Sequence, residues 1–312
     1  FPAPGAGGAV PSRSEHGMSE EAFEELVPGE FWREVVERVA SEAPDCLLIA
    51  EAFWLMEPFF VTELGMDRVY NSAFMHMLRE RENALFQRLL RNTVARAPEL
   101  LRRSVNFLTT PDEASAAEQF GRGDRYFGAC ALLAAMPGTP LFGHGQIEGL
   151  GEKYGMEFRR ARSDDPPHRD LVERHRREIV PLLAERHLFA GVDGLALLDF
   201  IGVDGVRWDE VFTWRTGRGE DLRLVAYNNS DQAVEGTLRD AGGGSLASLS
   251  GAEAAGAETL TLRDERLDVE LTCPLDRLRS EGLPIRLEAW QALVLAVEAD
   301  LPPVGTAATE EE

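Results

Sequence analysis

The sequence predicts an α/β protein, namely the C-terminal half of a (β/α)8 TIM barrel followed by an all-β sandwich. Short apolar runs alternate with helical segments up to about residue 190, which is typical of parallel βα units. Strand-like runs separated by turns then replace this alternation, which is typical of a β-sandwich. A complete barrel needs about 250 residues. The first part of the chain therefore supplies about half of the strands, and we expect the others to precede Phe1.

Composition divides the chain into three segments. Residues 1–189 are expected to form the half barrel, 190–301 the sandwich and 302–312 a disordered tail. Phe1 opens neither an initiator region nor a signal peptide, because no basic segment and no apolar core follow it. We therefore expect the chain to be a fragment that lacks the N-terminal half of the same protein.

Short apolar runs predict four strands in the half barrel: 46–50, 68–71, 104–108 and 141–143. The first of these is expected to be buried on both faces, as strands of parallel sheets are. Helical periodicity predicts the segments between and after them: 30–43, 58–64, 72–103 with an interruption near Pro98, 126–136 and 167–188. In the last of these helices, His168, His175 and His187 are expected at the surface.

The second part of the chain reads as short strands: 195–200, 211–214, 222–227, 234–238, 267–271 and 285–298. Turn sequences such as 228–231 and 242–244 separate them. This spacing indicates an all-β domain.

Charge excludes several classes of partner. The chain carries 54 acidic and 32 basic side chains, a net charge of −22. Nucleic acid and anionic membranes both attract basic surfaces, so neither is expected as a partner. No apolar run approaches the ~20 residues of a membrane span. The composition fits a protein that handles a neutral ligand.

The three cysteines, Cys46, Cys130 and Cys273, are far apart and odd in number. They are expected to be buried free thiols in a reducing compartment, which predicts a cytoplasmic protein. No CxxC pair is present to bind zinc.

Two carboxylates follow predicted strands directly. Glu51 ends the run Leu-Leu-Ile-Ala, and Asp112 follows the strand over 104–108. In a barrel, residues at the C-terminal ends of the strands carry the chemistry, and paired carboxylates are the groups that cleave glycosidic bonds. The apolar neighbours of Glu51 favour the neutral acid that such chemistry needs. The alternative is that each acid caps a following helix.

Three segments together resemble the α-amylase superfamily of glycoside hydrolases (family thirteen): LLIAEAFW, VNFLTTPDE and PGTPLFGHGQIEG. The resemblance covers nearly all of residues 30–300. It implies a (β/α)8 barrel with a C-terminal β-sandwich, with Glu51 as the general acid/base and Asp112 as the residue that stabilises the transition state. It also implies a retaining double displacement on α-glucans or α-glucosides, and it makes calcium a possible cofactor, although no ligand set is visible.

Two departures from the family pattern limit this reading. Pro111 and Thr110 stand where the family has His and Asn, and the strand that carries the nucleophilic Asp is absent. The isolated fragment is therefore expected to be inactive, and the oligo- or polysaccharide would be cleaved by the longer protein. An α-glucan transferase and a non-catalytic glucan-binding or regulatory barrel stay open as alternatives; Pro111 favours the latter.

Four further residues are candidates for sugar contacts. Trp54 and Tyr154 could stack on sugar rings or simply pack against neighbouring residues. His144 stands in a glycine-rich turn where the family has an aromatic residue, and His16 lies in a loop beside an acid. Loop packing is the alternative for both histidines.

Overall fold

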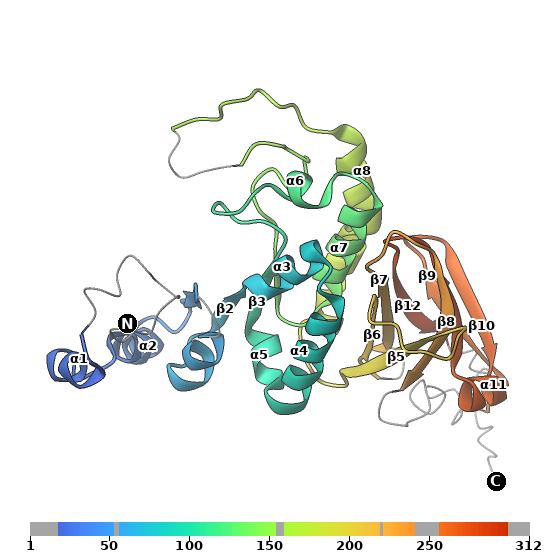
Figure 1. Ribbon diagram of the computed structural model, residues 1–312, viewed down its shortest axis with the longest axis horizontal. Helices are drawn as coiled ribbons and strands as arrows, with labels where there is room; N and C mark the ends of the chain where they lie inside the picture. Colours follow the sequence, from blue (N-terminus) through green and yellow to red (C-terminus); the bar gives the residue numbers. More distant parts are fainter. Residues whose placement is uncertain (1–17, 53–55, 154–158, 219–220, 241–255, 299–312) are drawn as a thin grey trace, which may run out of the picture. The chain divides into compact units, whose positions relative to one another are not determined.

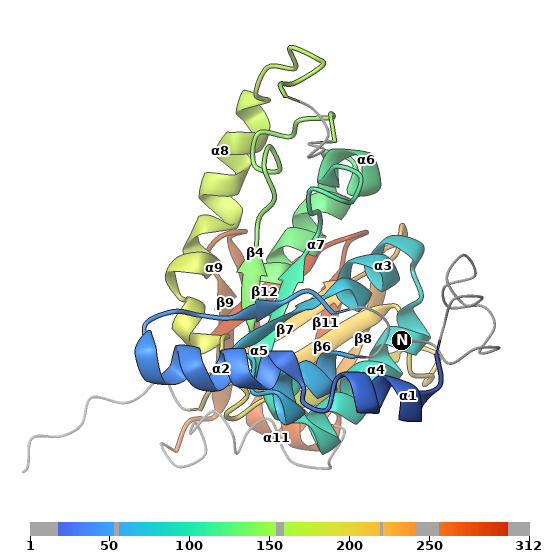
Figure 2. The same ribbon diagram turned by 90° about the vertical axis from the view of Figure 1, so that its left-hand side faces the viewer.

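A computed structural model describes residues 18–52, 56–153, 159–218, 221–240 and 256–298 (Figures 1 and 2). The chain separates into two compact units, one up to Val69 and the other from Tyr70 onward. Each unit is described by itself.

The first unit contains two helices, one π-helical turn and a pair of strands: α1 (Glu20–Leu26), α2 (Phe31–Glu42), β1 (Ile49–Ala50), η2 (Phe59–Glu63) and the start of β2 (Arg68–Asn71). The Ser19 hydroxyl accepts a hydrogen bond from the Ala22 amide and so caps α1. β1 pairs in parallel with β2, and the Leu48 amide donates to the Asp67 carboxylate at 2.9 Å. The predicted parallel arrangement is therefore present in this unit.

Much of the apolar surface of the first unit is exposed. Helix α2 has no buried residue, and Phe31, Leu47 and Ile49 are 63%, 65% and 53% exposed. The prediction of a strand over 46–50 buried on both faces is wrong in two respects. Only Ile49 and Ala50 form the strand, and Ala50 alone of the two is buried. Successive strand residues point to opposite faces, so one face of β1 is covered and the face of Ile49 is left open. Cys46, expected to be buried, is exposed.

The second unit begins with helices around short strands: α3 (Ser72–Glu80), α4 (Asn83–Arg96), α5 (Pro98–Arg103), β3 (Ser104–Phe107), α6 (Ala116–Phe120), α7 (Asp124–Ala135), β4 (Thr139–Leu141), α8 (Arg169–Glu178), α9 (Val180–Ala184) and the 3-10 turn η3 (Arg186–Leu188). Pro98 starts α5, where its missing N–H costs nothing. Pro181 likewise lies in the first turn of α9, so the segment predicted as one helix over 167–188 is two α-helices and a 3-10 turn.

Strand β3 pairs in parallel with β4, with Val105 opposite Thr139 and Phe107 opposite Leu141. All four residues of β3 are buried. The Asn71 side-chain amide donates to Oδ1 of the Asn106 side chain at 2.9 Å, which connects the end of β2 to β3. Parallel βα units, as predicted, therefore also form the start of the second unit.

Eight antiparallel strands follow: β5 (Ala196–Gly202), β6 (Val211–Thr216), β7 (Arg223–Asn228), β8 (Val234–Asp240), β9 (Thr259–Asp264), β10 (Val269–Pro274), β11 (Leu283–Leu287) and β12 (Ala292–Glu298), with α11 (Leu275–Ser280) after β10. Their order is β10-β9-β12-β7-β6-β5-β8-β11. β5 pairs with β6 through its first two residues and with β8 through the next five, and the strands curve together in Figure 1. The sequence missed β9, and the predicted strand over 285–298 is two strands separated by a turn at Trp290.

Apolar side chains occupy both faces of the central strands of this sheet, and both faces are buried. Phe212, Trp214 and Tyr227 belong to a core shared with the helices. Their neighbours in sequence, such as Val211 and Ala226, belong to a second core between the strands. Successive strand residues point to opposite faces, so this period of two builds two cores. Helix α7 covers β7 and β12 on the first face (Figures 1 and 2).

Two features hold the helices closely against the sheet. A Cβ on Gly128 of α7 would lie 2.1 Å from the Trp290 carbonyl oxygen, so only glycine allows this approach. The Arg266 guanidinium, 7% exposed, forms two hydrogen bonds with the Asp264 carboxylate and a third, at 2.9 Å, with the carbonyl of Glu178 at the end of α8.

In the parts of the chain that the structure describes, every helix falls short of the length and apolarity needed to cross a membrane.

Candidate active site

The loop that carries Asp112 leaves the C-terminal end of β3 and folds back on itself. The Gln119 side chain donates to the carbonyls of Leu108 and Ala114 at 3.1 and 2.7 Å. The Thr109 hydroxyl donates to the same Ala114 carbonyl at 2.8 Å. The Ser115 hydroxyl then caps α6, which begins at once. The loop is therefore a closed turn whose tip holds Pro111, Asp112 and Glu113.

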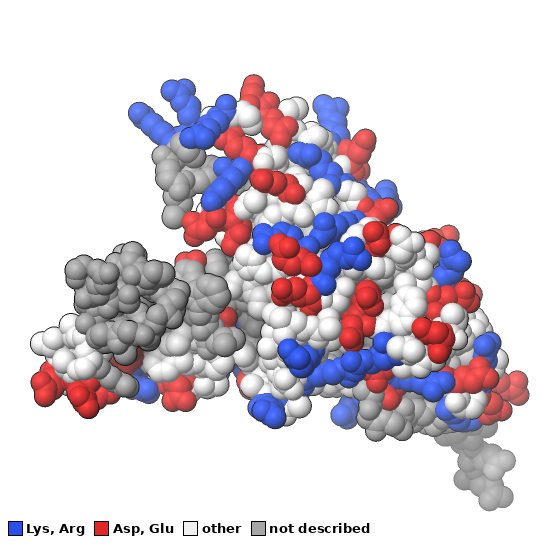
Figure 3. Space-filling model, in the orientation of Figure 1, with Lys and Arg blue, Asp and Glu red and all other residues white. Residues whose placement is uncertain are grey.

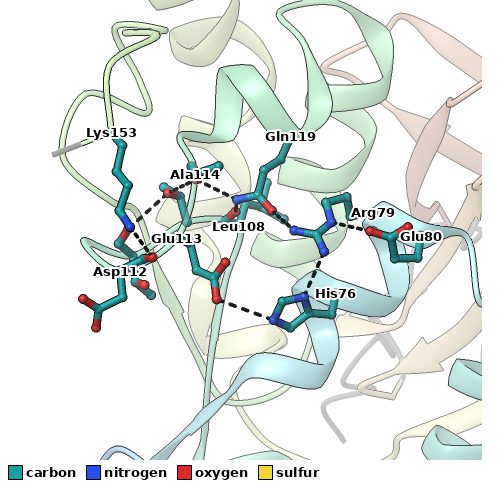
Figure 4. Close-up of polar contacts among 11 residues, drawn as sticks. His76, Arg79, Glu80, Leu108, Asp112, Glu113, Ala114, Gln119 and Lys153 are labelled. Atoms are coloured by element: carbon teal, nitrogen blue, oxygen red, sulfur yellow. Dashed lines mark hydrogen bonds and ion pairs between the residues drawn. The ribbon is translucent and has the colours of Figure 1, made fainter. Parts of the chain in front are cut away.

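Asp112 lies at this tip with an exposed side chain. Its backbone carbonyl accepts a hydrogen bond from the Lys153 ammonium at 2.6 Å. Figure 4 shows its carboxylate turned away from Glu113. The loop is thus attached to the next loop through the Asp112 backbone, and the carboxylate itself faces solvent.

Glu113, to which the sequence analysis assigned no role, contacts a histidine of a neighbouring helix. Its carboxylate is half-buried and lies 3.5 Å from His76 Nε2 of α3 (Figure 4). The Arg79 guanidinium lies 3.2 Å from His76 Nδ1 and donates to the Gln119 side-chain oxygen at 3.0 Å. A continuous polar chain therefore runs from Glu113 through His76 and Arg79 back to the base of the loop.

The loop after β4 lies beside the loop after β3. A Cβ on Gly143 would lie 2.5 Å from the Thr109 side chain, so the close approach of the two strand ends requires glycine here. His144 follows with an exposed side chain. The two loops enclose a hollow of about 20 Å³ lined by Thr109, Thr110, Pro111, Glu113, Ser115, Gly143, His144, Glu152 and Lys153. Among the described residues, Glu113 rather than Asp112 lines it together with His144.

Glu152 supplies a charged carboxylate to this hollow. The backbone amides of Ser163 and Arg162 donate to it at 2.8 and 2.7 Å, and these hydrogen bonds lower the pKa of Glu152. Three arginines of the segment that follows, Arg159, Arg160 and Arg162, are exposed. Figure 3 shows basic and acidic side chains side by side in the upper part of the molecule.

A buried polar cluster supports the loop after β4 from below. The Tyr126 hydroxyl donates to the Gln146 carbonyl at 3.0 Å and lies 2.8 Å from His175 Nε2. The Gln146 side chain in turn accepts from the Gly143 amide at 3.1 Å. Burial lowers the pKa of His175 to about 4 and raises that of Cys130, whose Sγ lies 3.7 Å from Nε2 of Gln146, to about 12. Both groups are therefore neutral near pH 7 and act as positioning residues.

The prediction that all three histidines of this segment lie at the surface is wrong for His175. His175 is 3% exposed, whereas His168 and His187 are exposed as expected. The flanking charges misled the prediction, because they occupy the other side of α8. Tyr126 and Phe127 of α7 cover the imidazole.

The remaining predicted residues divide as follows. Glu51 is exposed and follows β1 in the first unit, so its distance from Asp112 in the second unit stays a prediction. His16, Trp54 and Tyr154 lie outside the described residues.

Within the described ranges, no group of three or more His, Cys, Asp or Glu side chains is placed to hold a metal ion. Calcium stays an expectation from the family resemblance.

No protein-family model and no curated protein matches the sequence. Solved structures do match the fold. An α-amylase from Anoxybacillus superposes with a TM-score of 0.60 at 17% identity, over 86% of this chain and 56% of that one. A debranching enzyme from Nostoc punctiforme gives a TM-score of 0.61 at 17% identity, over 88% and 56%. An α-amylase from Geobacillus thermoleovorans in complex with acarbose gives 0.57 at 17% identity, over 86% and 57%.

These comparisons show the fold of α-amylases and debranching enzymes. The chain spans a little over half the length of each of these structures.

Proposed function

We propose that this chain is the C-terminal portion of an amylase-like glycoside hydrolase, comprising the second half of the catalytic barrel and a C-terminal β-sandwich. One observation carries the proposal. The parallel strands β3 and β4 end in adjoining loops with Glu113, His144 and exposed Asp112, in a chain that has the α-amylase fold over most of its length. Residues at this edge of parallel strands carry the chemistry of such folds.

In the proposed mechanism, Glu51 protonates the leaving oxygen and then activates water, while Asp112 stabilises the positive charge of the transition state. A retaining mechanism needs a nucleophilic carboxylate about 5–5.5 Å from the acid. We assign that group to the N-terminal half of the protein. The described residues form no ligand set for calcium, and no step of the proposal passes through a metal ion.

The exposed apolar residues of the first unit support the assignment of a missing half. Phe31, Leu47 and Ile49 each leave more than half of their surface exposed. Apolar surface of this size is normally covered by other protein. We propose that the N-terminal half covers it. A cytoplasmic location, expected from the free cysteines, also stays a prediction.

The test compares the 312-residue chain with the longer protein, using release of reducing ends from maltoheptaose. We expect no turnover by the 312-residue chain. In the longer protein, Glu51→Gln should lower kcat by about 10²–10⁴-fold, the contribution typical of a general acid. Asp112→Asn should lower it by about 10²–10³-fold. Glu42→Gln, an exposed substitution in the same unit as Glu51, is the control. A Glu51→Gln enzyme as active as its parent would contradict the assignment.

A non-catalytic glucan-binding or regulatory barrel is the second candidate. Pro111 at the position of the family histidine favours it, and so does the solvent-facing carboxylate of Asp112. Glucan binding by the longer protein without any cleavage would identify this case. Longer oligosaccharides among the products would instead identify a transferase.

A further inference from the structure

A groove lies away from the β3 and β4 loops, within the second unit. Its walls are the corner between α3 and α4 (81–85), the β5–β6 hairpin (207–210) and the β7–β8 turn (230–233). We call it the corner groove. Its volume is about 910 Å³, against about 20 Å³ for the hollow beside Glu113. Pockets that hold small organic ligands are typically about 300–1,000 Å³.

Trp208 lines this groove and is held in place by its own hairpin. Its indole Nε1 donates to the Asp204 carboxylate at 3.3 Å, and its ring meets Phe200 edge to face with centroids 6.3 Å apart. A Cβ on Gly202 would lie 2.6 Å from Nε1, so glycine lets the indole lie close to the strand backbone. The side chain is only partly buried. It is therefore an aromatic surface fixed before any ligand binds, which reduces the entropy cost of binding.

Polar side chains line the groove together with the indole. Arg207 pairs with Asp209 at 3.0 Å, and Arg81 lies 3.7 Å from Asp231. Glu82, Glu210 and Gln232 also belong to the lining. Two arginines stand against four carboxylates, so the groove repels anions. Hydrogen-bond donors and acceptors are both present, which suits a ligand whose rim carries many hydroxyl groups.

We propose that the corner groove is a second binding site for a neutral oligosaccharide, with Trp208 stacked against a sugar ring. A sugar ring has an apolar C–H face and a polar hydroxyl rim. An aromatic surface beside charged and amide groups matches both. The choice of an α-glucan as the ligand rests on the proposed function, whereas the location and the sugar chemistry follow from the groove itself.

The experiment titrates the 312-residue chain with maltoheptaose by isothermal calorimetry. Trp208→Ala should weaken binding by about ten-fold or more. Trp32→Ala, which removes an exposed tryptophan of the first unit, is the matched control and should leave binding unchanged. Circular dichroism and thermal unfolding check that each variant is folded. Gln232→Ala, an exposed substitution at the turn, should weaken binding by about two- to five-fold without disturbing the hairpin. Inorganic phosphate should not compete.

Each outcome decides one question. If a folded Trp208→Ala chain binds maltoheptaose as tightly as the parent chain does, the proposed binding site is wrong. The proposal is also wrong if the parent chain shows no binding. If Trp208→Ala does not fold, unchanged binding by Gln232→Ala overturns it and weakened binding supports it. Competition by phosphate also counts against it. Binding that depends on Trp208, in a longer protein that cleaves no α-glucan, supports the groove and overturns the proposed hydrolase. If cleavage by the longer protein is lost with Glu51→Gln but no binding depends on Trp208, the proposed hydrolase is supported and the corner groove is overturned as a binding site.

Discussion

The two units of this chain use the same local rules and reach different degrees of burial. Helix α2 of the first unit has apolar residues at a helical period, yet none of its residues is buried. Helix α7 of the second unit has ten of its twelve residues buried between helices and sheet. Periodicity therefore determines that a helix forms and which face is apolar. The surface available to cover that face determines how much the helix contributes to stability.

The difference has an energetic consequence. Burying one large apolar side chain stabilises a fold by about 1.5–3 kcal/mol. Phe31 and Leu47 are mostly exposed, so they contribute little of this stabilisation to the first unit. Phe74 and Phe86 are buried, so they contribute nearly all of it to the second unit. We therefore expect the second unit of the 312-residue chain to tolerate substitution poorly and the first to tolerate it well, as long as the proposed N-terminal half is absent.

The largest expected effect comes from a buried ion pair of the second unit. Asp264→Ala leaves the Arg266 guanidinium buried without its partner and should cost about 4 kcal/mol of unfolding free energy. The ion pair between Arg38 and Glu42 in the first unit is the matched comparison. Both of its side chains are more than 60% exposed, so Glu42→Ala should cost less than about 0.5 kcal/mol. Urea denaturation measures both, and equal losses would contradict the comparison.

A phenylalanine pair tests the burial argument directly. Phe86 packs against Phe74 and Phe212 at centroid distances of 6.1 and 5.3 Å, so Phe86→Ala should cost about 3 kcal/mol. Phe31→Ala should cost less than about 1 kcal/mol in the 312-residue chain, because Phe31 is 63% exposed. In the longer protein the cost of Phe31→Ala should rise. A cost that stays the same would argue against burial of Phe31 by the N-terminal half.

A glycine pair tests close packing in the same way. Gly128→Ala forces α7 away from the Trp290 carbonyl and the Tyr227 ring, and should cost about 2–3 kcal/mol. Gly29 of the first unit has no atom within 4 Å of a built Cβ, so Gly29→Ala should be nearly neutral. Thermal unfolding of the two variants decides whether the contact is as tight as described.

His175 makes stability depend on pH. Burial lowers its pKa in the folded state to about 4, below the value of about 6.5 in an unfolded chain. The unfolded state therefore binds more protons between these values. The stabilisation that results from keeping His175 neutral is complete above pH 6.5 and is lost as the pH falls toward 4. It amounts to on the order of 3 kcal/mol. His175→Gln should flatten the pH dependence in this window, whereas His187→Gln, at an exposed position, should not. An unchanged profile for His175→Gln would show that another group is responsible.

Much of the fold could be predicted from the sequence because its signals are local. The helices over 31–42 and 124–135 follow from apolar periodicity, and β3 from a short apolar run. Proline and glycine marked most boundaries. The sequence prediction missed β9, although Thr259–Asp264 alternates, and it joined β11 and β12 because the turn at Trp290 contains no glycine.

The candidate site was only partly predictable, because local sequence signals reveal residues that follow a strand but not contacts between distant segments. Asp112 was proposed because it follows a strand directly, and His144 because it stands in a glycine-rich turn where the resembled family has an aromatic residue. The contact of Glu113 with His76 was not found, because His76 belongs to a different helix and no local pattern marks the pairing. The spacing of Glu51 and Asp112 stays a prediction.

The sequence by itself determined the element types, the order of parallel units before antiparallel strands, and the two strand ends that carry acids. Only the tertiary structure decided which apolar faces are covered, that His175 is buried, and that Glu113 rather than Asp112 faces the hollow. The physical reason is that backbone periodicity is encoded by neighbours in sequence, whereas burial and side-chain pairing depend on residues brought together from distant parts of the chain.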